Sequence, residues 1–182
     1  MKRTVVLAVF VMFVLAVSAF GQAGTVSPTA TLAVSATVTP SIGIVFNKDT
    51  NGVTVTNPGT SAATIAFGSV SAYGTLPANV TQPAGSPTAT NFTVQTPVDA
   101  YVTATNSTSA TYTLTAKLLN SDTTNTWAVN NATVTNTTAG TATATGAYKT
   151  NVPVTVAITI PFSSTAALLN ISNTLNFVAT TN

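Results

Sequence analysis

The sequence lacks most of the residue types on which enzyme chemistry depends. It has no cysteine and no histidine, and its acidic residues are only Asp49, Asp99 and Asp122. Without cysteine the chain has no disulfide and no thiol nucleophile. The missing histidine and glutamate remove the commonest general bases and many metal ligands. We therefore predict no catalytic, cofactor or metal site, and we expect a protein that is not an enzyme.

Charge is also scarce, because charged residues make up 4% of the chain against about 25% in a typical soluble domain. The formal net charge of +2 comes from Lys2 and Arg3, since Lys48, Lys117 and Lys149 balance the three aspartates. No basic cluster is left to neutralise phosphates. The composition therefore argues against nucleic acid as a partner, and such a small net charge favours association between copies.

Long apolar runs are absent except near the N-terminus, where Lys2 and Arg3 precede an apolar stretch over residues 5–17. The stretch is shorter than the roughly 20 residues that a membrane-spanning helix needs, and small residues follow it. This layout is typical of a secretory signal peptide. We predict a signal peptide over residues 1–23, cleaved after Ala23. The protein is then secreted, extracellular or on the cell surface, and it meets the membrane only during export; an uncleaved anchor is the alternative.

The main pattern in the sequence is the alternation of apolar and polar residues. Hydrophobic residues make up 45% of the chain, and about one residue in five is threonine. In residues 152–160 every even-numbered position is a large aliphatic residue, and residues 98–104 and 112–118 alternate in the same way. A period of two predicts β-strands with one buried face. Helical periodicity is nearly absent, so we predict an all-β protein.

Turn signals divide this pattern into about 8–10 short strands within one domain over residues 41–182. Such spacing is typical of an antiparallel β-sandwich or a barrel, and we prefer the sandwich. Asn51 and Gly52 suit the tight turn of a hairpin that joins residues 42–46 to residues 53–55. Residues 77–90, with three prolines, and residues 136–146, rich in Thr, Ala and Gly, are predicted to be loops.

A second alternating segment lies at the start of the mature chain, over residues 24–40. Residues 29–39 carry no charge and are bounded by Pro28 and Pro40. Eleven extended residues span about 35 Å, enough to cross a sheet. A terminal strand of this kind can pair within its own domain, or it can be donated to a neighbouring subunit. The candidate donor positions share one face of the segment: Leu32, Val34, Ala36 and Val38.

Two other functions remain open. Trp127 and Val129 alternate as a core face, but Tyr101 lies on the outward face of its strand and is the candidate exposed aromatic residue. It would serve a monomeric surface adhesin or carbohydrate-binding module whose partner is a glycan. A small outer-membrane β-barrel is the other alternative, although the outward faces here are rich in threonine and poor in aromatics, unlike a lipid-facing band.

Residues 36–42, Ala-Thr-Val-Thr-Pro-Ser-Ile, followed by residues 65–70, Ile-Ala-Phe-Gly-Ser-Val, resemble secreted bacterial pilin-like subunits of the spore-coat-U type. The resemblance implies an Ig-like β-sandwich that donates its N-terminal strand. It also implies self-association into a homopolymer, a surface fibre or extracellular matrix, with an assembly chaperone as a further partner. The chain differs from many such subunits in having no cysteine pair.

Overall fold

A computed structural model describes part of the chain, namely residues 32–37, 41–70, 80–81, 90–162 and 170–182. The chain divides into two units, residues 1–37 and residues 38–182, and the described strands belong to the second unit. The predicted signal peptide lies outside the described residues, as do Val38 and most of the loop predicted for residues 77–90. The first strand begins at Ser41, where the sequence places the start of the sandwich domain.

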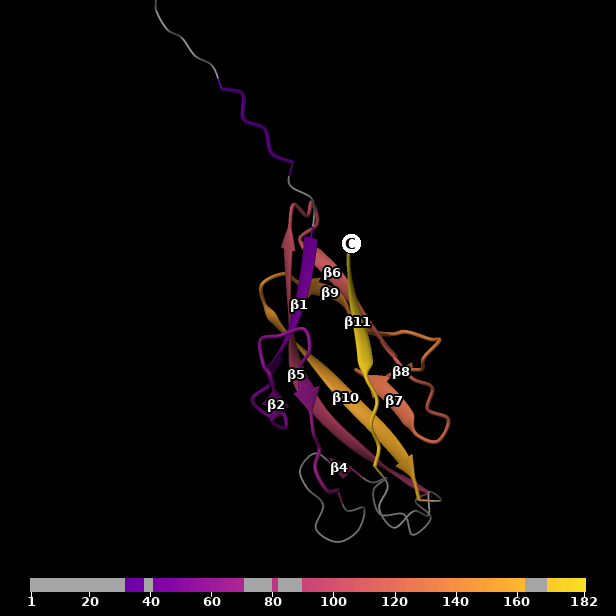
Figure 1. Cartoon of the computed structure of the whole chain (residues 1–182). Helices are drawn as coiled ribbons and strands as arrows, with labels where there is room; N and C mark the ends of the chain where they lie inside the picture. Colours follow the sequence, from indigo (N-terminus) through magenta and orange to yellow (C-terminus); the bar gives the residue numbers. More distant parts are fainter. Residues whose placement is uncertain (1–31, 38–40, 71–79, 82–89, 163–169) are drawn as a thin grey trace, which may run out of the picture. The chain divides into compact units, whose positions relative to one another are not determined.

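Every regular element of the described residues is a β-strand (Figure 1). There are eleven of them in this part of the chain, and three consist of only two residues. The prediction of about 8–10 strands is therefore close, because eight strands are longer than a single pair of residues. The strands are β1 (Ser41–Lys48), β2 (Val55–Thr56), β3 (Thr64–Ile65), β4 (Val80–Thr81), β5 (Asn91–Thr105), β6 (Thr111–Leu118), β7 (Thr126–Val129), β8 (Ala132–Val134), β9 (Gly140–Ala147), β10 (Asn151–Pro161) and β11 (Leu175–Thr181).

The strands form two main antiparallel sheets. The larger has the order β1-β5-β10-β7-β8, with β4 also paired to β5, and the smaller has the order β11-β6-β9. The pair β2 and β3 forms a separate two-stranded ladder. The predicted antiparallel β-sandwich is thus confirmed.

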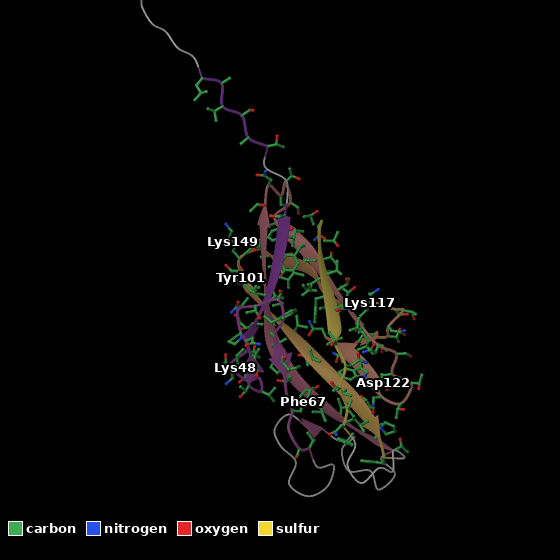
Figure 2. All side chains as sticks on the ribbon, in the orientation of Figure 1. Lys48, Phe67, Tyr101, Lys117, Asp122 and Lys149 are labelled. Atoms are coloured by element: carbon green, nitrogen blue, oxygen red, sulfur yellow. The ribbon has the colours of Figure 1, made fainter. Side chains whose placement is uncertain are left out.

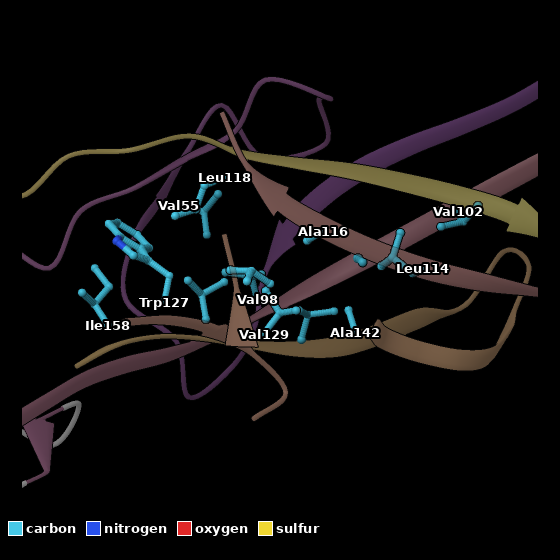
Figure 3. Packing of buried hydrophobic residues seen from close by; sticks show 14 of the residues in the cluster. Val55, Val98, Val102, Leu114, Ala116, Leu118, Trp127, Val129, Ala142 and Ile158 are labelled. Carbon is cyan, nitrogen blue, oxygen red and sulfur yellow. The ribbon is translucent and has the colours of Figure 1, made fainter. Parts of the chain in front are cut away.

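The apolar residues at alternate positions of β10 form part of one side of the hydrophobic core. The strand lies between β5 and β7, and Val154, Val156 and Ile158 are only 0%, 3% and 6% exposed. Figure 3 shows side chains from both sheets meeting in this core. The inward face of β6 supplies the facing half, as predicted, with four buried residues: Tyr112, Leu114, Ala116 and Leu118.

The two long sides of the sandwich differ, because hydrogen bonds between the sheets close one side and the other is open. Beside β8 and β9, the Leu118 backbone N–H donates to the Thr135 carbonyl at 3.0 Å, and the Asn130 side chain donates to the Ala142 carbonyl, so the sheets are joined there. On the opposite side, β1 is the outer strand of one sheet and β11 is the outer strand of the other. Within the described residues, no backbone hydrogen bond links these two strands. This side of the sandwich is open.

The loop predicted for residues 136–146 is wrong over most of its length, because β9 occupies Gly140–Ala147 and pairs with β6. Small residues are needed in this strand because its neighbours approach closely. A Cβ atom at Gly140 would lie 2.8 Å from the Val134 side chain, and one at Gly146 would lie 2.3 Å from the Tyr112 ring. The glycines that suggested a loop are therefore packing positions of a strand.

The hairpin predicted at Asn51 and Gly52 is also wrong. A turn does form, in which the Asp49 carboxylate accepts the Asn51 N–H at 2.7 Å, but neither Asn51 nor Gly52 has the positive φ of a tight hairpin turn. The chain then leaves β1: the Val53 N–H donates to Thr96 Oγ1, and β2 pairs with β3. The outer edge of β1 consequently has no hairpin partner.

Candidate functional site

An apolar groove of about 960 Å³ lies between β1 and β11, on the open side of the sandwich. The rings of Phe46 and Phe177 touch across it, with their centroids 4.9 Å apart. One wall is formed by β1 and then by residues 61–68, and the other by residues 171–177. The wall residues that also pack against the core are Ile44, Phe46, Ala63, Ile65, Phe67, Ile171, Leu175 and Phe177.

The floor of the groove is the core itself. Val98, Trp127, Val156 and Ile158 line it, and each is at most 6% exposed. The wall residues above them are only partly buried, and none of the described lining residues is charged. Uncharged polar residues also line the groove, among them Ser61, Thr64 and Asn173, so it is mainly rather than wholly apolar. A concave, mainly apolar site with a few polar groups commonly marks a binding site. The hydrophobic core is therefore incompletely covered along the line between the two sheets.

The two strands that border the groove also have edges that are not paired with another strand. β1 pairs with β5 alone, and β11 pairs with β6 alone, although Phe46 of β1 forms an isolated antiparallel bridge with Thr60 among the described residues. An unpaired edge is a template for a further strand, because its backbone groups still need partners. Apolar side chains and unpaired backbone groups thus occur together at this site.

Asp122 fixes the indole in the floor of the groove. Its carboxylate accepts hydrogen bonds from Trp127 Nε1 at 2.7 Å, from the Asn125 backbone at 2.9 Å and from the Thr124 backbone at 3.0 Å. Partial burial raises the pKa of Asp122, but the hydrogen bonds from Asn125, Trp127 and Thr124 outweigh it and lower the pKa to about 2. The folded state thus favours the ionised carboxylate.

We expect Asp122→Asn to reduce the free energy of unfolding at pH 7 by about 1 kcal/mol, because hydrogen bonds to a charged, partly exposed acceptor are weakened. The folded pKa of about 2 lies below the ordinary value of 3.8 for an aspartate, so the carboxylate stabilises the fold fully above pH 4 and progressively less as the pH falls to 2. The difference between parent and variant should therefore vanish over that interval. Urea unfolding followed by Trp127 fluorescence measures it.

Asp99→Asn is the matched control for this prediction. Partial burial and the nearby Asp49 raise the pKa of Asp99, although a hydrogen bond from Asn151 lowers it in part. The charged form of Asp99 is thus disfavoured by folding, and its removal should not destabilise the protein at pH 7. Equal losses in the two variants would contradict the role given to Asp122.

Three of the candidate donor positions, Leu32, Val34 and Ala36, lie in a described segment without regular secondary structure. Leu32 and Val34 are 87% and 83% exposed, and Ala36 is exposed as well. Val38 lies outside the described residues. Burial of these aliphatic side chains against another apolar surface would be favourable, by about 1.5–3 kcal/mol for each Leu or Val that becomes fully buried.

Tyr101 lies on the outward face of β5, as predicted, but it is half-buried rather than fully exposed (Figure 2). Its cross-strand neighbours are Val45 on β1 and Asn151 on β10. The other described aromatic residues do not extend this surface: Trp127 lies in the groove floor, and Tyr112 and Tyr148 pack together with ring centroids 5.2 Å apart. Among the residues that the structure describes, Tyr101 is therefore an isolated ring rather than part of a sugar-stacking platform.

The aspartates occupy separate turns and strands. Asp49 forms the turn after β1, Asp99 lies on β5, and Asp122 holds Trp127. Within the described part of the chain, no group of three or more His, Cys, Asp or Glu residues lies close enough to hold a metal ion.

Sequence patterns identified the strands that border the groove but not the groove itself. The sequence alternates in residues 42–46 and again at Leu175, Phe177 and Ala179. Their juxtaposition depends on the pairing order of the sheets, which places one strand at the edge of each. The available signal was that both segments lie near the ends of the domain, where edge strands often occur.

Comparison of the chain with models of protein families, with curated proteins and with solved structures finds no match. The described residues contain no helix of the length and apolar character needed to cross a membrane.

Proposed function

We propose that the chain is a secreted, non-catalytic structural subunit of a cell-surface fibre or extracellular matrix. Copies would join head to tail, with the N-terminal segment of one copy entering the groove of the next as an added β-strand. The observation that carries this proposal is the mainly apolar groove between β1 and β11, where the edge of β11 has no partner among the described residues.

The N-terminal segment matches the chemistry of the groove. Residues 29–39 and the described lining residues of the groove all lack charge. Leu32 and Val34 point their side chains from one face of an extended chain, and both are exposed. An added strand gains affinity from main-chain hydrogen bonds and specificity from side chains that enter pockets at alternate positions. A head-to-tail contact of this kind gives a filament where its rotation does not close into a ring.

The sequence before β1 favours insertion into a second copy over insertion into the same molecule. To enter its own groove, which runs beside β1, the segment would have to reverse direction within Val38, Thr39 and Pro40. Tight hairpin turns need residues with positive φ, whereas Val38 and Thr39 are β-branched and Pro40 is fixed near −65°. The partner that suits the groove is thus another subunit.

Electron microscopy of the processed chain, purified after export and examined across a concentration series without detergent, tests the proposal. We expect regular filaments whose number rises with concentration, and none from a variant lacking residues 29–39. A monomer at all concentrations that also fails to bind a synthetic peptide of residues 29–39 would contradict it. Binding of the peptide without filaments would point to an assembly factor missing from the sample.

A further inference from the structure

The edge of β11 that faces away from β6 carries unpaired backbone groups along the strand, and its residues 175–177 line the groove. At the ends of the strand, the Thr174 carbonyl accepts the Leu119 N–H at 2.8 Å and the Asn182 N–H donates to the Thr111 carbonyl at 3.2 Å. Even-numbered residues therefore bond to β6. Because backbone groups alternate in direction along a strand, the N–H and C=O groups on the free edge belong to the odd-numbered residues Leu175, Phe177, Ala179 and Thr181.

The edge of β1 is different, because part of it already has a partner. The Phe46 N–H donates to the Thr60 carbonyl at 3.0 Å, and the Phe46 carbonyl accepts the Gly59 N–H at 2.8 Å. By the same alternation, the backbone groups of Ile42, Ile44 and Lys48 also face outward from β1, and Ile42 and Ile44 line the groove. A strand added along the whole of β1 would have to break both bonds at Phe46.

The segment that holds Phe46 continues along the groove like a strand. Ala63, Ile65 and Phe67 are half-buried against the core, whereas Ala62, Thr64 and Ala66 are exposed (Figure 2 labels Phe67). The pairing of β3 with β2 anchors this segment through Val55, which is 6% exposed. Moving it away would uncover Ile65 and Phe67, which makes displacement costly.

We infer that an incoming strand adds to β11 alone and extends the sheet β11-β6-β9 to four strands, while Gly59 and Thr60 stay bonded to β1. This inference rests on the proposed function and names its acceptor edge. The occupant is residues 29–39 of a second copy, because its uncharged, alternating pattern fits the groove. The β1 edge is thus bonded by Gly59 and Thr60 of the same subunit, and the β11 edge accepts the strand of the neighbouring subunit.

Amide hydrogen exchange measured by NMR tests the inference. The sample is the processed full-length chain carrying Val34→Asp, which is designed to prevent self-assembly, with and without a synthetic peptide of residues 29–39. We expect the amides of Leu175, Phe177, Ala179 and Thr181 to exchange at least about tenfold more slowly when the peptide is bound. The amides of Asn176, Val178 and Thr180, already bonded to β6, should change little and act as internal controls.

Two outcomes would overturn the inference in distinguishable ways. Peptide binding that protects Ile42 and Ile44 while Phe46 loses protection would show that β1 is the acceptor, leaving the proposed function intact. The absence of any peptide binding would remove the acceptor edge and the proposed function together.

Two proline variants provide a second measurement. Ala179→Pro removes an outward N–H from β11 without touching the bonds to β6, and Ile42→Pro does the same at β1. We expect Ala179→Pro to weaken peptide binding about tenfold and Ile42→Pro to leave it nearly unchanged. The reverse order of the two affinities would place the incoming strand on β1.

Discussion

We expect Val34→Asp to abolish filament formation by the processed chain, raising the concentration needed for assembly by at least about 100-fold. Val34 is 83% exposed in its own molecule, so the substitution should leave the subunit folded. In the filament, however, the side chain at this position would enter a groove whose described lining residues are all uncharged. A carboxylate without a partner in apolar surroundings costs several kcal/mol, and more than about 2.7 kcal/mol suffices for a 100-fold effect.

Ser35→Asp is the matched control for Val34→Asp. It introduces the same charge one residue away, but on the opposite face of an extended strand, where it would point to solvent. We expect its filaments to form at concentrations within a few-fold of the parent. Sedimentation and electron microscopy measure both variants. Equal loss of assembly in the two would mean that charge alone, rather than the face it occupies, controls association.

The strands that were predicted best are those whose burial follows directly from alternation. β10 and β6 have aliphatic or aromatic residues at every second position and lie with one face on the core. In such strands the local pattern and the tertiary environment agree, so the sequence alone is enough to predict the strand and its buried face. The same holds for Trp127 and Val129, which are buried as expected.

β9 could not be predicted, because side chains of the neighbouring strands require small residues at its glycine positions. Gly140 and Gly146 are strand positions only because Val134 and Tyr112 occupy the adjacent space. The local sequence contains no large residue to mark a buried face. A prediction would have needed to know that Tyr112 on β6 points at β9, which is information about pairing rather than propensity.

The groove escaped prediction for a related reason. The segments around Ile44 and Phe177 are more than 100 residues apart in sequence and do not pair with each other. They lie close together only because each belongs to the outer strand of a different sheet. The sequence did indicate a strand that could be donated, but not the site that would accept it. Half of the proposed contact was therefore visible in the pattern of residues 29–39, and the other half required the fold.

Occupation of the groove should stabilise the subunit strongly. We expect a peptide of residues 29–39 to raise the free energy of unfolding of the Val34→Asp chain by about 2.7 kcal/mol at a free concentration of 100 times its Kd. The physical reason is that aliphatic side chains would cover Ile44, Phe46 and Phe177, which are only partly buried. Each fully buried Leu or Val contributes about 1.5–3 kcal/mol. With no cysteine for a disulfide, burial of this kind is a main source of additional stability.

Guanidinium unfolding of the Val34→Asp chain at several peptide concentrations measures this effect. The control is a peptide of the same length with Val34→Asp, which should not shift the midpoint because its charge cannot enter the groove. A midpoint that is independent of the parent peptide, or one that shifts equally with both peptides, would contradict binding through this face. A shift confined to the parent peptide would mean that the free subunit is an incompletely stabilised fold, completed by the strand of its neighbour.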